Sequence, residues 1–388
     1  MITREFGFES FAYYQLIINY GNLLGVLFAA GFGLLAIQSF SGNKIYHLKY
    51  ENLLVRLYFS LVGGATLFLI ILALIVGSLG QASIFLVIMT ALCFSFNRVV
   101  SMSLTGLKKQ ILSVAVRDFS MPSAILLLIF LTTVTMEQLI FSRNIILFIA
   151  ASIALIFVLK KSKHFLKRKG FSLKKIRRPI NYKYFKVLFK NFSINLCRLL
   201  NDKLDVFVAP IMLTPLEFGS YMFVRTFLSI LGVPFGTVTR MYSPEVRSLI
   251  GTKRCISKEK KFKNLNKLIA ILLIASGIVL WSKFLSITAI VGVEITFSFN
   301  FMFFLILAHI IEAIFGQNLA LLTFANLRRE VILGLSITLG VSSIVTPLLI
   351  YQYGTVGAAM SVAVTILLKN SIMDYFCRKK LALSPSCF

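Results

Sequence analysis

Residues 330–352 read EVILGLSITLGVSSIVTPLLIYQ and residues 355–376 read TVGAAMSVAVTILLKNSIMDYF, with only Tyr353 and Gly354 between them. Each run is mainly apolar and long enough to cross a membrane, because a spanning helix needs about 20 such residues. The rest of the chain has the same character: its 388 residues are 58% hydrophobic and 14% charged, with a mean hydropathy of +0.87. Soluble domains are about a quarter charged, so a soluble enzyme is excluded. A content of 37 Phe and 13 Tyr also excludes a disordered chain.

The hydropathy pattern predicts an all-α polytopic membrane protein. Eleven apolar runs are candidate spans, at residues 11–40, 53–77, 82–105, 111–135, 141–159, 189–213, 217–241, 264–282, 297–325, 330–352 and 355–376. Most links between them are short, and two longer links are rich in lysine and arginine.

The basic residues indicate the orientation of these spans. Lysine and arginine number 41 against 14 acidic residues, a net charge of +27. In a soluble protein this excess would indicate nucleic-acid binding, but here the cations alternate with the spans, as the positive-inside rule predicts. Odd-numbered links and the C-terminus are basic, whereas the even-numbered links carry few cations, among them Arg143 and Lys283. We expect a cytoplasmic C-terminus, an N-terminus outside, no nucleic-acid partner and a twelfth helix missing upstream of Met1.

An internal repeat relates the two halves of the chain. A shift of 207 residues aligns Phe11 with Phe218 and residues 24–28 (LGVLF) with residues 231–235 (LGVPF). Both segments run inward from the outside, as in transporters built from parallel repeats. If the second half has six helices, the first half lacks its first helix. The expected division is an N-terminal bundle of five helices (1–159), a basic cytoplasmic linker (160–188) and a C-terminal bundle of six helices (189–388).

Four short motifs suggest a family. They are FESFAYY at 8–14, TPLEFGSY at 214–221, YSPE at 242–245 and YGTVGAA at 353–359. Together they resemble motifs of the O-antigen and lipid-linked oligosaccharide flippases, which belong to the multidrug/oligosaccharidyl-lipid/polysaccharide (MOP) exporter superfamily. Ala12 departs from the pattern, which has glycine at this position.

The resemblance implies a twelve-helix exporter-like fold, here without its first helix, in two pseudo-symmetric bundles. It implies that the protein flips a polyprenyl-diphosphate-linked oligosaccharide, such as an O-antigen repeat unit of lipopolysaccharide, across the bacterial inner membrane by alternating access. The implied partners are this lipid-linked substrate, membrane lipids and other polysaccharide-assembly membrane proteins. No cofactor or metal is expected.

Ionisable residues inside the spans are the candidate site residues, because a charge at bilayer depth is costly. Arg198, Asp202 and Asp205 share one helix face by their spacing, and Arg225 on the next span should meet Asp205 at equal depth. Arginine suits a diphosphate because it stays charged and offers a bidentate fork. We expect substrate contacts from Arg198, Arg225, Arg117 and Arg98, and supporting or ion-coupling roles for Asp202, Asp205, Glu312, Asp118 and His309. The alternative is that Arg198–Asp202 and Arg225–Asp205 are ion pairs that only fix helix packing.

Pro234 and Gly236 are a candidate hinge, because a proline inside a span kinks the helix. Two other functions are open. An ion-coupled multidrug or cation antiporter of the same fold would favour an acidic cavity, whereas the charges inside the spans lean slightly basic. A membrane polysaccharide polymerase would carry its chemistry in a large outer loop, but the outer links are short. No Walker A, GxSxG or HExxH motif occurs, so we predict no catalytic residue.

Overall fold

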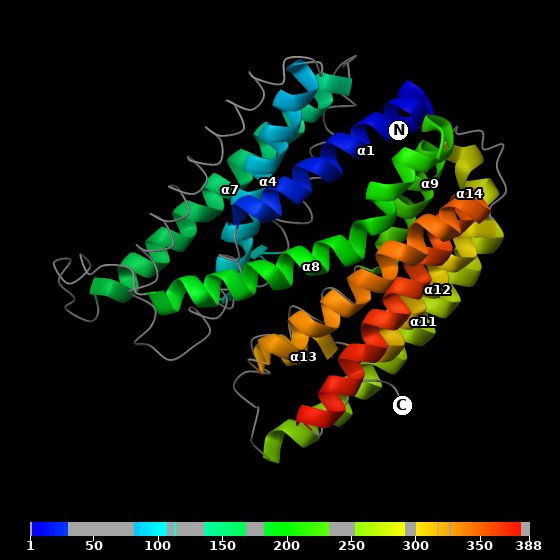
Figure 1. Cartoon of the computed structure of the whole chain (residues 1–388). Coiled ribbons are helices and arrows are strands. Elements are labelled where there is room, and N and C mark those ends of the chain that lie inside the picture. Colours follow the sequence, from blue (N-terminus) through cyan, green and yellow to red (C-terminus); the bar gives the residue numbers. More distant parts are fainter. Residues whose placement is uncertain are drawn as a thin grey trace. The chain divides into compact units, whose positions relative to one another are not determined.

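The computed structural model describes residues 2–29, 81–106, 112–113, 136–167, 182–232, 253–291, 300–316, 318–325 and 327–381. Within these ranges every regular element is a helix (Figure 1). They are α1 (Ile2–Ala29), α4 (Gln81–Gly106), α7 (Met136–Lys167), α8 (Tyr182–Met212), α9 (Pro215–Leu228), the 3-10 turn η3 (Ser229–Leu231), α11 (Lys253–Val291), α12 (Asn300–Phe315), α13 (Asn318–Phe324) and α14 (Arg328–Leu381). The predicted span 53–77 and nearly all of 111–135 lie outside the described residues.

Four of the described helices are long and apolar enough to cross a membrane. The qualifying segments are Phe85–Leu104 in α4, Glu137–Ile156 in α7, Lys263–Phe284 in α11 and Arg328–Leu381 in α14. The first three correspond to predicted spans, and the fourth has 54 residues and covers two.

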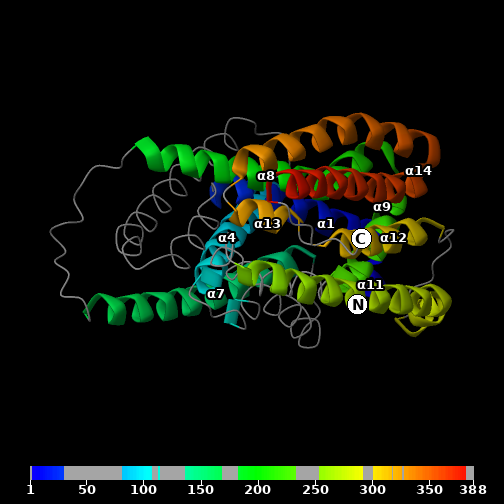
Figure 2. The same ribbon diagram turned by 90° about the horizontal axis from the view of Figure 1, so that it is seen from below.

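Helix α14 is a hairpin formed by the two apolar runs of residues 330–376. The chain reverses at Gly354, whose φ of 56° and ψ of −129° are non-helical and cost a glycine little. The two halves lie side by side (Figure 1, Figure 2). The Ser342 hydroxyl of the first half is hydrogen-bonded to the Thr365 hydroxyl of the second at 2.9 Å. The predicted link at Tyr353 and Gly354 is therefore confirmed.

Several helices extend beyond their predicted spans into the basic links. Helix α7 continues to Lys167 and α8 begins at Tyr182, so both enter the stretch 160–188. The 39 residues of α11 measure about 58 Å at 1.5 Å per residue, nearly twice the roughly 30 Å of bilayer hydrocarbon. The charges of lysine and arginine limit the part of a helix that is embedded in the membrane. They do not end the helix, because both residues are good helix formers.

The predicted span 297–325 is divided in two. Helix α12 ends at Phe315, Gly316 has a φ of 70°, and α13 begins at Asn318. The side-chain amide of Asn318 donates to the Phe315 carbonyl oxygen at 2.9 Å, which satisfies one of the acceptors left at a helix end. The prediction of one continuous helix here is wrong, because the backbone turns at Gly316 within an apolar run.

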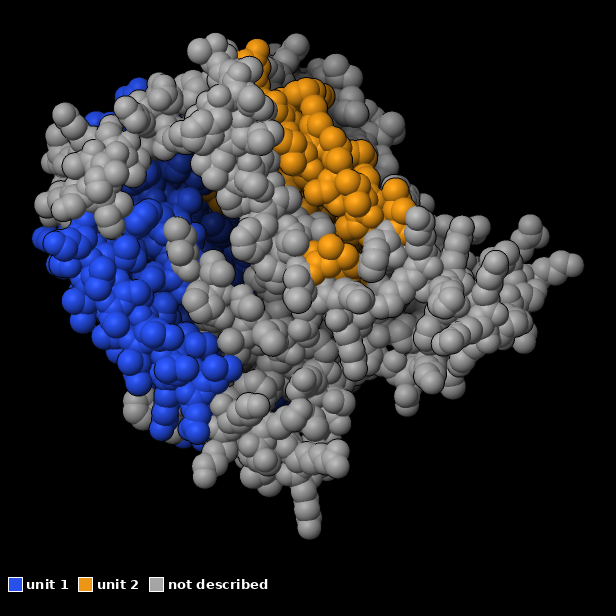
Figure 3. Space-filling model, turned by 180° about the vertical axis from the view of Figure 1, so that it is seen from behind, with its two compact units in different colours: residues 1–15, 197–388 blue, residues 16–196 orange. Residues whose placement is uncertain are grey.

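The chain divides into two compact units (Figure 3). Unit 1 comprises Met1–Gln15 and Cys197–Phe388, and unit 2 comprises Leu16–Leu196. In unit 2, α4 packs along α7 (Figure 1, Figure 2). In unit 1, α14 packs on α12 and α13, and α12 packs on α11 and α9. The boundaries between the units fall inside α1 and α8.

The beginning of α1 packs on α9, its counterpart in the sequence repeat, within unit 1. At Gly219 the α9 backbone lies so close to the Phe8 carbonyl that a β-carbon would overlap with it. The Phe223 ring packs edge-on against Phe8 and Phe11, with centroids 5.9 and 6.2 Å apart. The glycine of the TPLEFGSY motif therefore has a packing role.

Candidate substrate site

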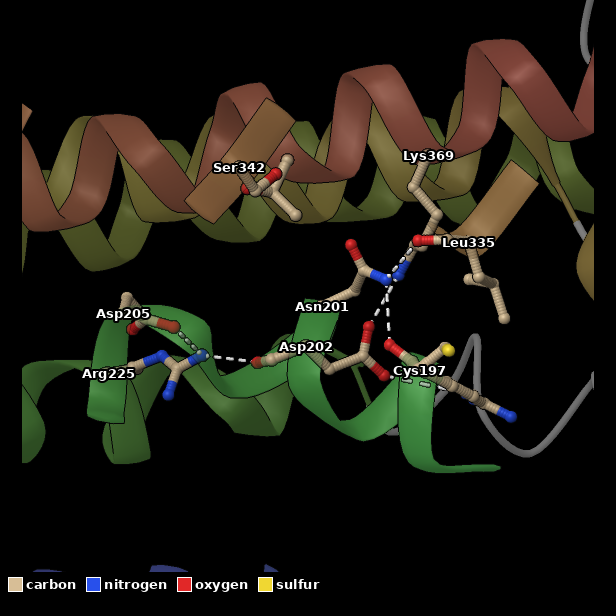
Figure 4. Close-up of polar contacts among 10 residues, drawn as sticks. Cys197, Asn201, Asp202, Asp205, Arg225, Leu335, Ser342 and Lys369 are labelled. Atoms are coloured by element: carbon tan, nitrogen blue, oxygen red, sulfur yellow. Dashed lines mark hydrogen bonds and ion pairs between the residues drawn. The ribbon is translucent and has the colours of Figure 1, made fainter. Parts of the chain in front are cut away.

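Helix α8 supplies the first part of the candidate site. Arg198, Asp202 and Asp205 lie on one face of this continuous helix, as their spacing predicts. The Asp202 carboxylate contacts two cations: Lys369 Nζ lies 2.7 Å from Oδ1, and Arg198 Nε lies 3.6 Å from Oδ2. Figure 4 shows Lys369 reaching Asp202 from α14. One carboxylate is thus shared by two cations at unequal distances.

The predicted contact between Arg225 and Asp205 is confirmed. Arg225 Nη2 lies 3.0 Å from Asp205 Oδ1 and donates to the backbone carbonyl of Asp202 at 2.8 Å (Figure 4). The Tyr221 hydroxyl donates to the other Asp205 oxygen. Asp205 and Tyr221 are buried, and hydrogen bonds to charged groups are the stronger kind. Arg225 therefore ties α9 to α8.

The turn between α8 and α9 sets the register of this contact. Thr214 Oγ1 accepts from the Glu217 backbone N–H at 3.3 Å, and the Glu217 carboxylate accepts from the Thr214 N–H at 3.0 Å, a reciprocal helix cap. Pro215 occupies the first turn of α9, where its missing N–H would have had no partner in any case. The TPLE sequence is therefore a helix start that directs Arg225 toward Asp205.

Helix α8 is also tied to both halves of the α14 hairpin. The Asn201 side-chain amide donates to the Leu335 carbonyl oxygen in the first half at 2.9 Å and to Cys197 within α8 at 2.8 Å (Figure 4). Lys369 reaches Asp202 from the second half. These contacts fix the position of Asp202 relative to the two halves of α14.

The three contacting cations differ in accessibility. The exposed fraction of the side chain is 53% for Arg198, 14% for Arg225 and 6% for Lys369. Arg198 also has the longest ion-pair distance of the three. Arg225 and Lys369 are ion-paired and largely enclosed, while Arg198 keeps an accessible guanidinium.

His309 and Glu312 of α12 belong to the same charged environment. Glu312 interacts electrostatically with Lys369 and His309, and His309 interacts with Arg225. Lys203 interacts with both Asp202 and Asp205. With the acidic groups ionised, this part of unit 1 holds four cations, Arg198, Lys203, Arg225 and Lys369, against three carboxylates, Asp202, Asp205 and Glu312. The cations of this cluster therefore outnumber its carboxylates by one. No cluster of three or more metal-ligating side chains occurs in the described ranges.

The other predicted site residues are not brought into this cluster by described contacts. Arg98 belongs to unit 2, where its Nη2 donates to Asn195 Oδ1 at 3.3 Å and its guanidinium lies 6.0 Å from the Phe94 ring centroid. Arg117 and Asp118, and the candidate hinge at Pro234 and Gly236, lie outside the described residues.

Two buried cations differ from the sequence-based expectations. Lys369 was not among the candidates, although a lysine inside the span 355–376 was a signal that could have found it. Arg143, expected among the cations of the outer links, lies inside α7 and is fully buried, so that assignment is wrong. Its guanidinium donates to the Asn144 side-chain oxygen at 3.4 Å.

Neither a protein-family profile nor a curated protein sequence matches the chain, but solved structures do. A MOP superfamily transporter from Pyrococcus furiosus, described as having a binding pocket of reverse polarity, aligns with a TM-score of 0.67 and 12% identity over 97% of this chain and 88% of its own. A multidrug resistance MATE family transporter of the MOP superfamily, in an outward-facing conformation, aligns with a TM-score of 0.59 and 12% identity over 96% and 86%.

The bent form of a Vibrio cholerae MATE transporter gives a TM-score of 0.55 and 11% identity over 96% of this chain and 86% of its own. These structures belong to the superfamily whose motifs the four short sequence motifs resemble. The structural alignments cover nearly the whole chain. The chain has the all-α, multi-pass fold of the MATE transporters of the MOP superfamily, which confirms the fold class predicted from the sequence.

Proposed function

We propose that the protein moves a polyprenyl-diphosphate-linked oligosaccharide from the cytoplasmic to the outer leaflet of the bacterial inner membrane by alternating access. The observation that carries this proposal is the accessible guanidinium of Arg198. It lies in a cluster with one more cation than carboxylates, beside an acid that Lys369 already binds at 2.7 Å.

The chemistry of the substrate explains why such a cation is needed. An unpaired phosphate charge is very costly in hydrocarbon, and the diphosphate must cross about 30 Å of it. A guanidinium stays charged at any physiological pH and binds phosphate oxygens through two parallel hydrogen bonds. Arg198 would supply this contact, while Arg225 and Lys369 hold α8, α9 and α14 around it.

The proposal also includes a location and partners. The C-terminus lies in the cytoplasm, and the protein works beside other polysaccharide-assembly membrane proteins. The similar solved structures are transporters, which supports transport without chemical conversion of the substrate.

Transport in reconstituted vesicles tests the proposal. A fluorescent polyprenyl-diphosphate-linked oligosaccharide should cross the bilayer of vesicles containing the wild-type protein. Arg198→Ala should lower the initial rate at least tenfold, about 1.4 kcal/mol of lost stabilisation, and leave insertion and melting temperature unchanged. Arg329→Ala, which removes an exposed arginine of α14, is the matched control. No movement with wild-type protein, or a wild-type rate with Arg198→Ala, would contradict the proposal.

A multidrug or cation antiporter is the second candidate. The observation in its favour is that a similar solved structure is a multidrug resistance transporter. Asp202, Asp205 and Glu312 would then serve a cationic ligand or a coupling ion. The description of reverse pocket polarity in the Pyrococcus furiosus transporter supports the idea that this fold carries pockets of either charge. Uptake of a cationic dye driven by a Na⁺ or proton gradient, without movement of the lipid-linked sugar, would favour this function.

A further inference from the structure

We infer that Lys369 is a positioning residue: by holding the Asp202 carboxylate, it keeps the Arg198 guanidinium available for the diphosphate of the substrate. This inference rests on the proposed function and adds a role for a residue that itself need not touch the substrate. It predicts that Lys369 acts on binding through Asp202.

The contacts of Asp202 carry the first step. Arg198 and Asp202 are one helical turn apart, a spacing at which side chains on a helix are neighbours. Yet the Arg198–Asp202 distance is 3.6 Å, whereas the Lys369 ammonium lies 2.7 Å from the same carboxylate. Lys369 is also the more enclosed cation, with 6% of its side chain exposed against 53% for Arg198. The acid is therefore bound mainly to the lysine.

The surroundings of Lys369 carry the second step. Glu312 interacts electrostatically with the ammonium, and Asn201, next to Asp202, is hydrogen-bonded to Leu335 at 2.9 Å. The Asn201 hydrogen bond and the Lys369–Asp202 ion pair hold the carboxylate in place between α8 and α14. Lys203 is shared between Asp202 and Asp205, so it does not replace Lys369 as a dedicated partner.

Removal of the ammonium changes the partner of Asp202. Without Lys369, the remaining cation within ion-pair distance of this carboxylate among the described residues is Arg198, 3.6 Å away on the same helix face. A guanidinium and a carboxylate can then close into a bidentate pair, which neutralises the group that would otherwise bind phosphate. If the carboxylate charge of Asp202 is removed together with the ammonium, Asp202 no longer competes with the phosphate for Arg198.

Three variants test this logic: Lys369→Met, Lys369→Arg and the double variant Lys369→Met with Asp202→Asn. Binding of a fluorescent polyprenyl diphosphate to purified protein in nanodiscs should weaken about tenfold in Lys369→Met. It should stay within about twofold of wild type in Lys369→Arg and recover toward wild type in the double variant. In transport assays the single variant should raise KM more than it lowers kcat. Lys379→Met, which removes an exposed lysine of the same helix, is the matched control.

A second measurement needs no substrate. Modification of Arg198 by phenylglyoxal, followed by peptide mass spectrometry, should be slower in Lys369→Met than in wild type and should be restored in the double variant. Unchanged binding and labelling in Lys369→Met, or a double variant that binds as weakly as the single one, would overturn the inference while leaving the proposed function intact. Wild-type protein that does not bind the diphosphate would overturn the proposed function, and the inference with it.

Discussion

The two units bury polar side chains in different ways. Unit 1 pairs carboxylates with cations, as at Asp205 and Arg225, which lie 3.0 Å apart. In the described part of unit 2, the neutral side chain of Asn144 makes buried contacts with a hydroxyl and with a guanidinium instead. Asn144 donates to the Thr90 hydroxyl at 2.9 Å and accepts from Arg143 at 3.4 Å.

This difference indicates where a substitution is costly. Removal of one partner of a buried ion pair leaves an uncompensated charge and costs about 3–5 kcal/mol. Removal of one partner of a hydrogen bond between neutral groups leaves the other donor or acceptor unsatisfied. If that group is buried, the cost is about 1–3 kcal/mol. The stability of unit 1 should therefore depend more strongly on single polar side chains than that of unit 2.

The largest effect is expected at Asp205. Asp205→Ala removes the counter-charge of Arg225 and the acceptor of the Tyr221 hydroxyl, so it should destabilise the protein by about 3–5 kcal/mol. Thermal melting in detergent, followed by size-exclusion chromatography, measures the loss. The double variant Asp205→Leu with Arg225→Met removes both charges and should be more stable than Asp205→Ala. If the single variant melts with wild type, the pair is not what holds α9 to α8.

A smaller effect is expected at Asn144 in unit 2. Asn144→Ala removes one acceptor of the Arg143 guanidinium and the donor to Thr90, with an expected cost of about 1–3 kcal/mol. The same melting assay measures it, with Phe141→Ala at an exposed position of α7 as a control for helix content. A loss equal to that of Asp205→Ala would remove the distinction between the units.

The smallest effect is expected at a neutral pair within unit 1. Thr365→Val keeps the side-chain shape and removes the hydroxyl that contacts Ser342 at 2.9 Å. Hydrogen bonds of this kind between membrane helices contribute about 0.6 kcal/mol on average. Hydrogen exchange in α14, measured by mass spectrometry, should change only slightly. A cost close to that of Asp205→Ala would show that position in unit 1, rather than charge, determines the energy.

The sequence predicts the helices well where hydropathy changes sharply. The span 82–105 corresponds to α4 (Gln81–Gly106), and the two-residue link at Tyr353 and Gly354 corresponds to the turn of the α14 hairpin. The break at Gly316 could not be predicted in the same way, because the residues around it are as apolar as the helices and a positive φ leaves no trace in hydropathy.

The candidate site could be predicted only in part. Contacts that follow from residue spacing along α8 and across one short turn can be predicted from the sequence. The contact between Asp205 and Arg225 is of this kind. Lys369 lies close to the basic C-terminal end of its span, where a long side chain could equally extend to the membrane surface. Only its contact with Asp202, a residue 167 positions away, brings it into the charged cluster, and no local sequence pattern predicts a contact over such a separation.

Helices α8 and α9 are joined by a turn of Leu213 and Thr214, by the reciprocal cap at Glu217 and by the bridge from Arg225 to Asp205. These three connections indicate that α8 and α9 move as one rigid body with a fixed interhelical angle. We expect Arg198 on α8 and Arg225 on α9 to keep a constant separation when the bundle rearranges. A phosphate bound at Arg198, as proposed, would then move together with both helices and would not be transferred from one to the other.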